Sequence, residues 1–349
     1  MSPLYTGAVD LAELDYDLPP ALIAQAPAPS RDASRLLLID RARQTFEDRV
    51  FADLPEVLRP GDCLVVNDSR VIPARVRARD ADGRAIELLF FEREDDRRWW
   101  ALVRPGRRCR PGAELVAGSA RLSVVGAAAD GPRLVERLDG TIEDLLATDG
   151  LPPLPPYIAH FVAPTAEDRE RYQTVYAEPP GSVAAPTAGL HFTEALLGRL
   201  GACGIEVHRL TLHVGPATFR PITAPRVEDH VLAPERMLVP SATADAVNRA
   251  RAEGRRVVAV GTTTTRALES ATGPDGRVTP GARAAGAYIV PGHRFRVVDA
   301  LLTNFHLPRS SLLVLVSAFA GRELVLKAYR HAIGAGYRFY SYGDATLIV

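Results

Sequence analysis

The sequence predicts an α/β fold in which a main α/β domain carries an inserted small antiparallel β-barrel domain. Strand-like and helical segments alternate after residue 155, which is typical of an α/β layer. Between residues 70 and 150, short strand-like runs are separated by Asp-Gly, Pro-Gly and Gly-rich turns about every 8 to 12 residues, which is typical of a barrel or sandwich. We therefore expect a discontinuous α/β domain of residues 1–68 and 156–349 and a barrel domain of residues 69–155.

The segments before the barrel predict the first part of the α/β domain. Residues 34–40 and 45–51 are typical of a strand pair, and residues 52–58 of a short helix. Residues 59–67 predict a turn and then a buried strand that ends at Asn67. After the barrel, the Pro-rich residues 151–158 predict a stiff linker.

Helical and strand periods alternate in the rest of the chain. Helices are predicted over residues 165–177, 193–204, 241–254 (with Ser241 as N-cap) and 323–337, and the apolar residues 310–320 are interpreted as a buried helix. Residues 205–215, 255–261 and 297–304 predict strands. The last segment, 337–349, predicts a strand, a polar loop and a second strand.

The composition is that of an ordinary globular protein. The 349 residues are 47% hydrophobic and 24% charged with a formal net charge of +0, and no 18-residue apolar run occurs. Cys63, Cys109 and Cys203 form no C-x-x-C pair, which argues against a disulfide framework and a zinc site. These features, together with an N-terminus that lacks a signal peptide's apolar core, predict a cytoplasmic protein without a membrane segment.

Polar loops follow four predicted strands, at residues 67–70, 262–266, 303–306 and 341–344. Because ligands of α/β sheets gather at the carboxyl ends of strands, we expect these loops to line one cleft. Gly261 and the four threonines that follow predict an anion site at a helix start, to which Arg266 adds charge. The alternative is a Thr N-cap alone. No Walker A or G-x-G-x-x-G motif supports a nucleotide loop.

The chain has only 8 histidines, and four of them lie beside turns or polar loop residues: His191, His213, His230 and His306. Histidine is the common proton shuttle near pH 7, so each is a candidate general acid or base. The alternative is that each only satisfies a loop carbonyl. No ligand spacing indicates a metal, and no G-x-S-x-G motif indicates a nucleophile.

The segment 70–110 holds 12 arginines and 7 acidic residues, with Trp99 and Trp100 between them. Basic and aromatic side chains together suit single-stranded RNA. The alternatives are a solvated barrel face with a tryptophan in its core, and a genome-wide preference for arginine, since Lys327 is the only lysine.

Several long strings resemble the S-adenosylmethionine:tRNA ribosyltransferase-isomerases of queuosine biosynthesis. The resemblance runs from about residue 16 to the C-terminus, and the barrel between residues 77 and 150 carries no motif of its own. The strings are YDLPPALIAQ, GDCLVVNDSRVIPARV, LPPYI, YQTVYAEPPGSVAAPTAGLHFT, TLHVGPATFRPI, VEDH, VAVGTTTTRALES, VDALLTNFHLPRSSLLVLVSAFAG and YRFYSYGDATLI.

The resemblance implies transfer of the ribosyl part of S-adenosylmethionine to tRNA. The acceptor is the primary amine of 7-aminomethyl-7-deazaguanine (preQ1) at the wobble position, and the transferred group rearranges to give epoxyqueuosine-tRNA while adenine and methionine leave. The resemblance implies no metal and no cofactor beyond S-adenosylmethionine as co-substrate. The partner is then the preQ1-bearing tRNA, and we expect a monomer.

The reaction requires a base, an acid for the leaving adenine and an anchor for the methionine carboxylate. The four histidines are the proton-transfer candidates, with His191 preferred, and Glu228, Asp229 and Asp344 are alternatives. Small residues around Gly189 permit close approach of a ligand, and Thr193 caps the following helix. The predicted binding residues are Asn67, Asp68, Arg70, Pro186, Thr187, Ala188, Gly189, Phe192, Thr218, Phe219, Gly261, Thr262, Thr263, Thr264, Arg266, Asn304, Arg309, Ser341, Tyr342 and Asp344.

The chain departs from the family pattern at three places. Asp68 stands in NDSR where relatives read NNTR, Pro216 and Ala217 stiffen the loop after His213, and Ala233 replaces a second histidine. Two other functions compete with the ribosyltransferase. One is an S-adenosylmethionine-dependent RNA methyltransferase, which would release S-adenosylhomocysteine, and the other is an RNA-binding module without turnover.

Overall fold

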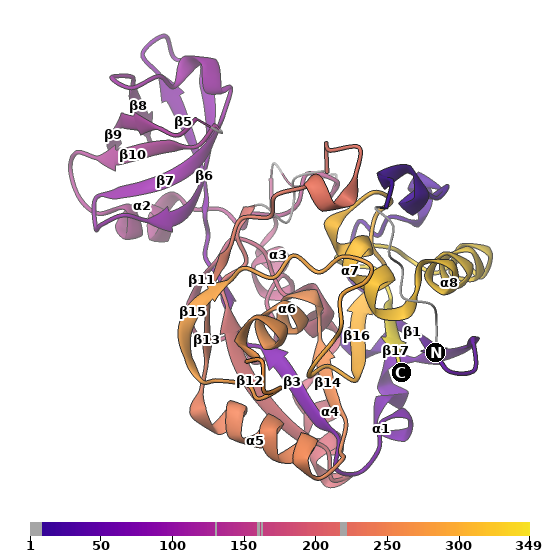
Figure 1. The fold of residues 1–349 in the computed structure, drawn as a ribbon. Helices are drawn as coiled ribbons and strands as arrows, with labels where there is room; N and C mark the ends of the chain where they lie inside the picture. Colours follow the sequence, from indigo (N-terminus) through magenta and orange to yellow (C-terminus); the bar gives the residue numbers. More distant parts are fainter. Residues whose placement is uncertain (1–8, 130, 159–160, 162, 217–221) are drawn as a thin grey trace. The chain divides into compact units, whose positions relative to one another are not determined.

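The computed structural model describes all residues except 1–8, 130, 159–160, 162 and 217–221. The chain forms two compact units, shown in Figure 1. Unit 1 contains residues 1–69, 173–179 and 186–349, and unit 2 contains residues 70–172 and 180–185. This architecture, a mixed sheet with helices and a separate barrel, confirms the predicted fold class.

Unit 1 is built on a mixed sheet of nine described strands in the order β15-β13-β12-β3-β14-β16-β17-β1-β2. The central strands β12, β3, β14 and β16 are mutually parallel, whereas β17 runs antiparallel to β16 and parallel to β1. The bounds are β1 Arg35–Asp40, β2 Thr45–Val50, β3 Cys63–Asn67, β12 Glu206–Leu212, β13 Glu235–Val239, β14 Val257–Val260, β15 Gly281–Ala285, β16 Ala300–Asn304 and β17 Ala345–Ile348.

Six α-helices and several 3₁₀ turns of unit 1 are described alongside this sheet. The helices are α1 Leu54–Val57, α4 Glu194–Ala202, α5 Ser241–Ala252, α6 Thr262–Ala271, α7 Ser311–Ala320 and α8 Arg322–Gly334. The 3₁₀ turns are η1 Leu11–Leu14, η2 Pro20–Leu22, η3 Arg31–Ala33, η4 Phe51–Asp53, η6 Thr187–His191 and η8 Val227–Asp229.

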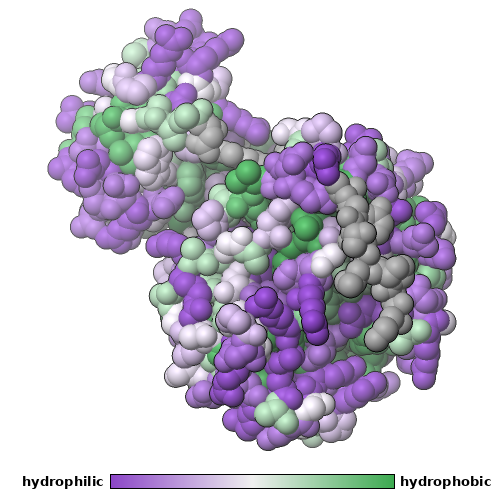
Figure 2. Space-filling model, viewed as in Figure 1, coloured by the Kyte–Doolittle hydropathy of each residue, from purple (hydrophilic) through white to green (hydrophobic). Residues whose placement is uncertain are grey.

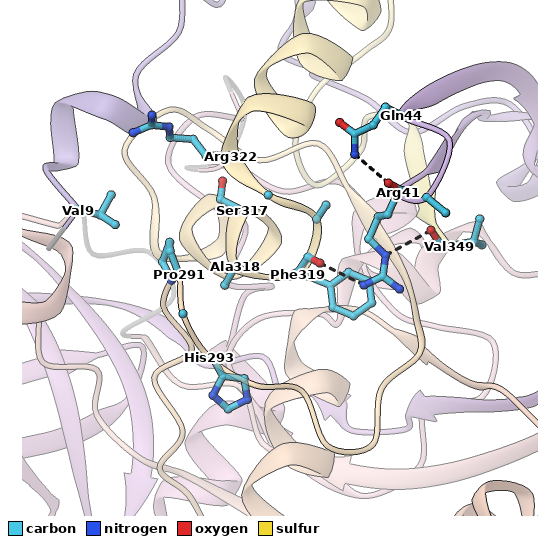
Figure 3. A pocket seen from close by; sticks show the side chains of 14 residues that line it. Val9, Arg41, Gln44, Pro291, His293, Ser317, Ala318, Phe319, Arg322 and Val349 are labelled. Carbon is cyan, nitrogen blue, oxygen red and sulfur yellow. Dashed lines mark hydrogen bonds between the residues drawn. The ribbon is translucent and has the colours of Figure 1, made fainter. Parts of the chain in front are cut away.

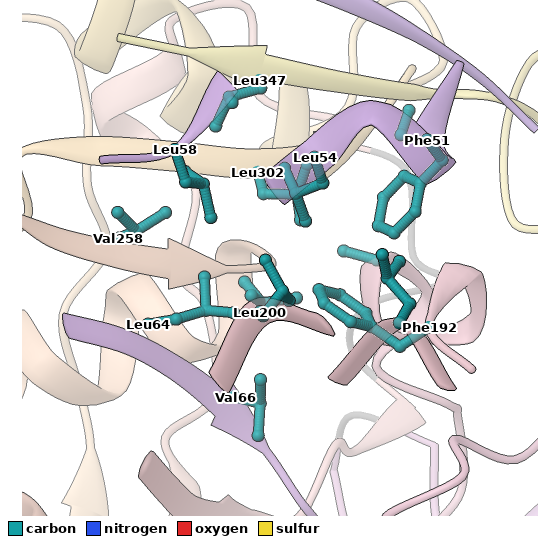
Figure 4. Close-up of a cluster of buried hydrophobic side chains, with 14 of the residues drawn as sticks. Phe51, Leu54, Leu58, Leu64, Val66, Phe192, Leu200, Val258, Leu302 and Leu347 are labelled. Carbon is teal, nitrogen blue, oxygen red and sulfur yellow. The ribbon is translucent and has the colours of Figure 1, made fainter. Parts of the chain in front are cut away.

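One hydrophobic core joins the sheet to η4, α1 and α4 (Figure 4). The strands contribute Leu64 and Val66 from β3, with further aliphatic side chains from β14, β16 and β17. Phe51 and Phe192 pack edge to face, with ring centroids 5.1 Å apart, and close the core beside η6. The core therefore fixes the positions of the segments that flank residue 191.

Unit 2 is a closed six-stranded antiparallel barrel in the order β10-β7-β6-β5-β8-β9. Helix α2 adds Ile142 and Leu145 to the barrel core, and Trp99 is buried in that core. The elements are β4 Arg70–Val71, β5 Arg75–Asp80, β6 Ala85–Arg93, β7 Arg98–Arg104, η5 Gly106–Arg108, β8 Glu114–Ala117, β9 Ala120–Ala127, β10 Arg133–Arg137, α2 Ile142–Asp149, α3 Ala166–Arg171 and β11 Pro180–Ser182.

Unit 2 extends beyond the predicted barrel domain of residues 69–155. Buried Arg75 donates to the carbonyls of Leu154 and Phe161, both at 2.7 Å, and its guanidinium lies 4.9 Å from the centroid of the Phe161 ring. These bonds attach the Pro-rich segment to the barrel. The contacts of the chain accordingly group residues 156–172 and 180–185 with unit 2.

Several local predictions differ from the structure. The helix predicted over 165–177 is only α3, because the β-branched Thr174 and Val175 disfavour continuation. Pro240, not Ser241, is the N-cap of α5. Strands β13 and β15 were not predicted; β15 reads GARAA, which has little strand propensity. Residues 337–340 form no strand, since only Phe339 makes an isolated bridge.

The surface of each unit is mainly hydrophilic on the face shown in Figure 2. Among the described residues, the large hydrophobic side chains that are exposed are scattered valines and one leucine: Val50, Val116, Val125, Val231 and Leu238. No described helix is long and apolar enough to cross a membrane.

Candidate active site

The predicted polar loops of unit 1 meet at one edge of the mixed sheet. Strands β3, β14 and β16 end there, because they are parallel. The loop 341–344 was predicted to follow a strand. In the structure it follows no strand and instead precedes β17. It reaches the same edge because β17 runs antiparallel to β16, with Asn304 opposite Ala345.

The segment Pro186–His191 lies at this edge and is mostly buried. Gly189 is required by close packing: a Cβ atom there would lie 2.2 Å from the hydroxyl of Tyr176 and 2.7 Å from Cγ2 of Thr174. Thr193 caps α4 as predicted, accepting a hydrogen bond from the amide of Leu196 at 3.1 Å. Phe192 belongs to the hydrophobic core.

His191 is held on three sides. Its Nδ1 lies 2.7 Å from Oγ of Ser34, its Nε2 lies 3.2 Å from Nδ2 of Asn304, and its ring stacks on Phe51 at a centroid distance of 5.0 Å. Burial lowers the pKa of His191 to about 3, and the charges of Arg338 and Arg31 act in the same direction. The imidazole is therefore neutral at pH 7.

The turn from β14 into α6 packs against the same segment. Gly261 has φ 89°, and a Cβ atom there would lie 3.6 Å from Cβ of Ala188. Gly261 is the N-cap of α6 and supplies no side-chain cap. Because α6 begins directly after β14, the first amides of this helix point toward this edge of the sheet. Thr262 and Thr264 are buried, whereas Thr263 is partly exposed. A helix therefore begins where the anion site was predicted, and the anion site itself stays a prediction.

Arg266 does not fit the predicted role of a carboxylate anchor. Its guanidinium donates to Glu235 at 2.5 Å and to the carbonyls of Ala285 and Ala287 at 3.2 and 3.0 Å. The residue is 6% exposed. The buried Glu235 carboxylate already neutralises its charge, so we assign Arg266 to the framework of the site.

Asn67 and Asp68 are also tied into the sheet. The Asn67 side chain bonds both the amide and the carbonyl of Leu212, at 3.0 and 2.9 Å, which leaves it a bridge between β3 and β12. Asp68 accepts from the Thr211 hydroxyl at 2.7 Å, and burial raises the pKa of its carboxyl group. Both residues lie at the carboxyl end of β3, as predicted, but the side-chain amide of Asn67 is hydrogen-bonded to the backbone of Leu212.

His306 is buried in an aromatic cluster. Its Nε2 lies 3.0 Å from Oγ1 of Thr303, and its amide donates to the Tyr329 hydroxyl at 3.1 Å. Burial lowers the pKa of His306 to about 3. The Tyr16 hydroxyl bonds the carbonyl of His306, so the whole residue is fixed at the end of β16.

His213 and His230 belong to different surroundings. His213 follows β12, and burial together with Arg236 lowers its pKa. Its Nδ1 is buried and bonds to no described residue. His230 packs edge to face on Tyr288 at 5.5 Å, and burial lowers its pKa as well. Glu228 and Asp229 are exposed within η8, and Glu228 accepts a hydrogen bond from the amide of Val9 at 2.9 Å.

The remaining predicted residues are distributed as follows. Arg70 opens β4 in unit 2, and Arg309 has φ 56° and forms an ion pair with Asp15. Asp344 accepts from the amides of Arg35 and Arg338, at 3.0 and 2.8 Å, which gives it a structural part at the sheet edge. Ser341 and Tyr342 are buried in the same loop. Thr218 and Phe219 lie outside the described residues.

Sequence reasoning missed three residues of this site, namely Ser34, Glu235 and Tyr176. Ser34 precedes a strand and has no motif, and Tyr176 was included in a predicted helix. Glu235 had a usable signal, because it lies two residues after Ala233, where the chain departs from the family pattern. Each acts through contacts with a distant segment, and only the folded chain provides these.

The chain matches known proteins over nearly its whole length. The family model described as "Queuosine biosynthesis protein" matches residues 11–348. The chain belongs to this family. The predicted family is thereby confirmed.

Two curated relatives within the family are similar to this chain across its length. A Symbiobacterium thermophilum protein is 50% identical and a Moorella thermoacetica protein 51% identical; in each case the match covers 97% of this chain and 99% of the relative. Both are named S-adenosylmethionine:tRNA ribosyltransferase-isomerase. A crystal structure of the S-adenosylmethionine tRNA ribosyltransferase of Thermotoga maritima is 37% identical, with a TM-score of 0.54 and coverage of 97% of this chain and 100% of that one.

This member of the queuosine biosynthesis family also has a cavity of about 600 Å³ in unit 1 (Figure 3). It lies at the opposite edge of the sheet, because Val349 follows the end of β17 and Arg41 follows the end of β1. Arg41 stacks on Phe319 at 4.1 Å and donates to carbonyls at its rim. None of the predicted site residues that the structure describes lines this cavity.

The described residues contain no group of three or more His, Cys, Asp or Glu side chains placed to hold a metal ion. The three cysteines are free thiols, of which Cys63 and Cys109 are buried.

Proposed function

We propose that this protein transfers the ribosyl part of S-adenosylmethionine to tRNA and isomerises it. The observation that carries this proposal is the match to the two relatives named S-adenosylmethionine:tRNA ribosyltransferase-isomerase, at 50% and 51% identity over 97% of the chain. The methyltransferase alternative receives no support from these relatives. The acceptor in our proposal is the preQ1 amine at the wobble position, the product is epoxyqueuosine-tRNA, and adenine and methionine leave.

S-adenosylmethionine is the co-substrate in this proposal, and no other cofactor takes part. We further propose that the protein acts as a monomer in the cytoplasm. The sulfonium group acidifies the neighbouring C–H, so a base can remove that proton, and the leaving adenine needs a proton of its own.

The N-terminus of α6 suits the methionine carboxylate. Its amides carry partial positive charge, Gly261 leaves them uncapped, and the partly exposed Thr263 adds a hydroxyl. This assignment replaces Arg266, whose donors are bound to Glu235 and two carbonyls.

Asn304 suits an N–H or O–H group of adenine or ribose. Its side-chain oxygen is buried and bonds to no described residue, although the residue is only 2% exposed. A buried acceptor without a partner costs about 1 to 3 kcal/mol, which a ligand donor would offset.

His191 is our preferred base. It is neutral at pH 7, lies beside Asn304 at the sheet edge and is carried by the segment that packs on the α6 turn. His306 shares the neutral state but is enclosed by Tyr16, Tyr329 and Thr303. His213, His230 and Asp229 remain candidates for the protonation of adenine.

A single-turnover assay tests the proposal. The purified full chain is mixed with S-adenosylmethionine and preQ1-bearing tRNA, and nucleosides and small molecules are analysed by mass spectrometry. We expect epoxyqueuosine together with equal amounts of adenine and methionine. Formation of S-adenosylhomocysteine would indicate a methyltransferase, and tRNA binding without any product would indicate an RNA-binding module; either result overturns the proposal.

A further inference from the structure

We infer that Ser34 and Asn304 are positioning residues that hold His191 as the neutral imidazole protonated on Nδ1, with Nε2 as the acceptor. The hydrogen positions follow from the contacts of these side chains. Their meaning for the reaction rests on the function proposed above.

The carbonyl of Tyr340 determines the orientation of the Asn304 amide. Nδ2 of Asn304 lies 3.0 Å from this carbonyl oxygen. A carbonyl only accepts hydrogen bonds, so the NH₂ end of the amide must face it; the flipped amide would place two oxygens against each other. The orientation of Asn304 is therefore determined by a group that cannot change its role.

The oriented amide in turn determines the tautomer of His191. The same Nδ2 atom lies 3.2 Å from Nε2 of His191, and an amide nitrogen only donates. Nε2 is therefore the acceptor, and the single proton of the neutral ring is on Nδ1. A proton on Nε2 would bring two donors face to face.

Ser34 completes the chain of hydrogen bonds in the same direction. Nδ1–H of His191 donates to Oγ of Ser34 across 2.7 Å, and Oγ donates to the carbonyl of Arg31 at 3.3 Å. The chain thus runs from Asn304 through His191 and Ser34 to a backbone acceptor. Each donor in this chain has one acceptor, and no other arrangement of the hydrogens satisfies all four contacts.

The backbone at Tyr340 supports this arrangement. Tyr340 has φ 77°, which is unusual for a residue with a bulky side chain. The turn is held by the Tyr340 amide, which donates to the carbonyl of Phe305 at 3.1 Å, and by the Gly343 amide, which donates to the carbonyl of Tyr340 at 3.0 Å. A strained turn therefore presents the carbonyl that orients Asn304.

The surroundings of the ring also oppose a charged imidazole. His191, Ser34 and Asn304 are 5%, 2% and 2% exposed, and Phe51 covers one face of the ring. The charged groups that act on it are Arg31 from η3 and Arg338 from the loop before β17, and both are positive. Nε2 is consequently the one ring nitrogen with a lone pair for a substrate proton.

Nuclear magnetic resonance of the full chain, labelled with ¹⁵N in histidine, tests the inference without any substrate. The His191 signals are assigned by their loss in His191→Gln. We expect Nδ1 to carry a proton and Nε2 to be bare in the wild type between pH 6 and 8.

Asn304→Asp is the decisive variant, because a carboxylate accepts where the amide donated. We expect it to move the proton of His191 to Nε2 or to charge the ring, with a rise of the titration midpoint by about 2 units or more. Thr303→Val is the matched control on the same strand: its hydroxyl contacts His306, so only the His306 signals should change.

Ser34→Ala removes the acceptor for Nδ1–H, and Ser34→Thr restores a hydroxyl. We expect Ser34→Ala to lower the rate of epoxyqueuosine formation about 10-fold or more and to shift its pH profile, and we expect Ser34→Thr to recover most of the rate. Where Asn304→Asp does not fold, Asn304→Ala replaces it, with exchange between the two tautomers as the expected signal.

Three results would overturn the inference: a wild-type His191 that carries its proton on Nε2, a ring that is charged at pH 7, or a tautomer unchanged by the substitutions at both 304 and 34. The expected tautomer in a protein that forms no epoxyqueuosine would instead overturn the proposed function alone.

Discussion

Arg266 and Glu235 form a buried ion pair between α6 and β13, with Nη1 and Oε2 2.5 Å apart and side chains 7% and 5% exposed. The second carboxylate oxygen of Glu235 accepts a hydrogen bond from the amide of Gly215 at 2.9 Å. The pair therefore ties three segments together: the helix that starts at the candidate anion site, the strand beside it and the loop that follows His213.

Removal of one partner of this pair should destabilise unit 1. Glu235→Ala leaves the Arg266 charge buried without a counterion, and we expect the free energy of unfolding to fall by about 3 to 5 kcal/mol in urea titrations. The double variant Glu235→Ala/Arg266→Met should lose less than the sum of the single losses. Additive losses would contradict the ion pair as the main interaction.

Gly189→Ala should be poorly tolerated. The added Cβ atom would meet the Tyr176 hydroxyl at 2.2 Å, so either η6 or Tyr176 must move, at a cost of about 1 to 3 kcal/mol. Tyr176→Phe removes the nearest atom and should recover part of that stability in the double variant, as measured by thermal unfolding. Gly198→Ala in α4, where no atom lies within 4 Å of the new Cβ, is the control.

The buried histidines should make stability depend on pH. The pKa values of His191 and His306 fall from 6.5 to about 3 in the folded chain, so the unfolded chain binds protons that the folded chain does not. Stability is therefore fully present above pH 6.5 and is lost as the pH falls toward 3, by about 1.4 kcal/mol per pH unit for each residue.

The raised pKa of Asp68 acts in the opposite direction, since its protonated form is favoured in the folded chain. We therefore compare His191→Gln and His306→Gln with the wild type by urea unfolding at pH 6.5 and 4.5. Each variant should show a smaller drop between these pH values, by about 2 to 3 kcal/mol. An equal drop in all three proteins would contradict a depressed histidine pKa.

Substitution of the two barrel tryptophans should distinguish a residue needed for folding from a residue that contacts RNA. Trp99 is 7% exposed in the barrel core and cannot stack on bases, so Trp99→Ala should cost about 3 to 5 kcal/mol of stability. Trp100 is partly exposed, and its indole N–H donates to Glu94 at 3.2 Å. Trp100→Ala should leave stability nearly unchanged. Filter binding measures the tRNA affinity of this variant. If Trp100→Ala binds tRNA as tightly as the wild type, the Trp100 side chain does not contact the RNA.

The sequence predicted the elements whose signal is local. The apolar run VVAVG predicted β14, the Thr193 cap predicted the start of α4, and Asp-Gly and Pro-Gly turns predicted the barrel, because period, caps and turn residues act within a few positions of the chain. Strand β15 was missed because GARAA has neither alternation nor β-branched residues, and it forms a strand through its partner β13.

The sequence by itself determined the family, the two-part fold and which loops carry polar residues, because these properties reside in strings of adjacent residues. Only the tertiary structure decided what each polar side chain does. In the folded chain, Arg266 forms an ion pair with Glu235, and the Asn67 side chain is hydrogen-bonded to the backbone of Leu212. His191 lies between Ser34 and Asn304. These partners lie from 31 to 157 positions apart, and a hydrogen bond or ion pair depends on distance in space rather than along the chain.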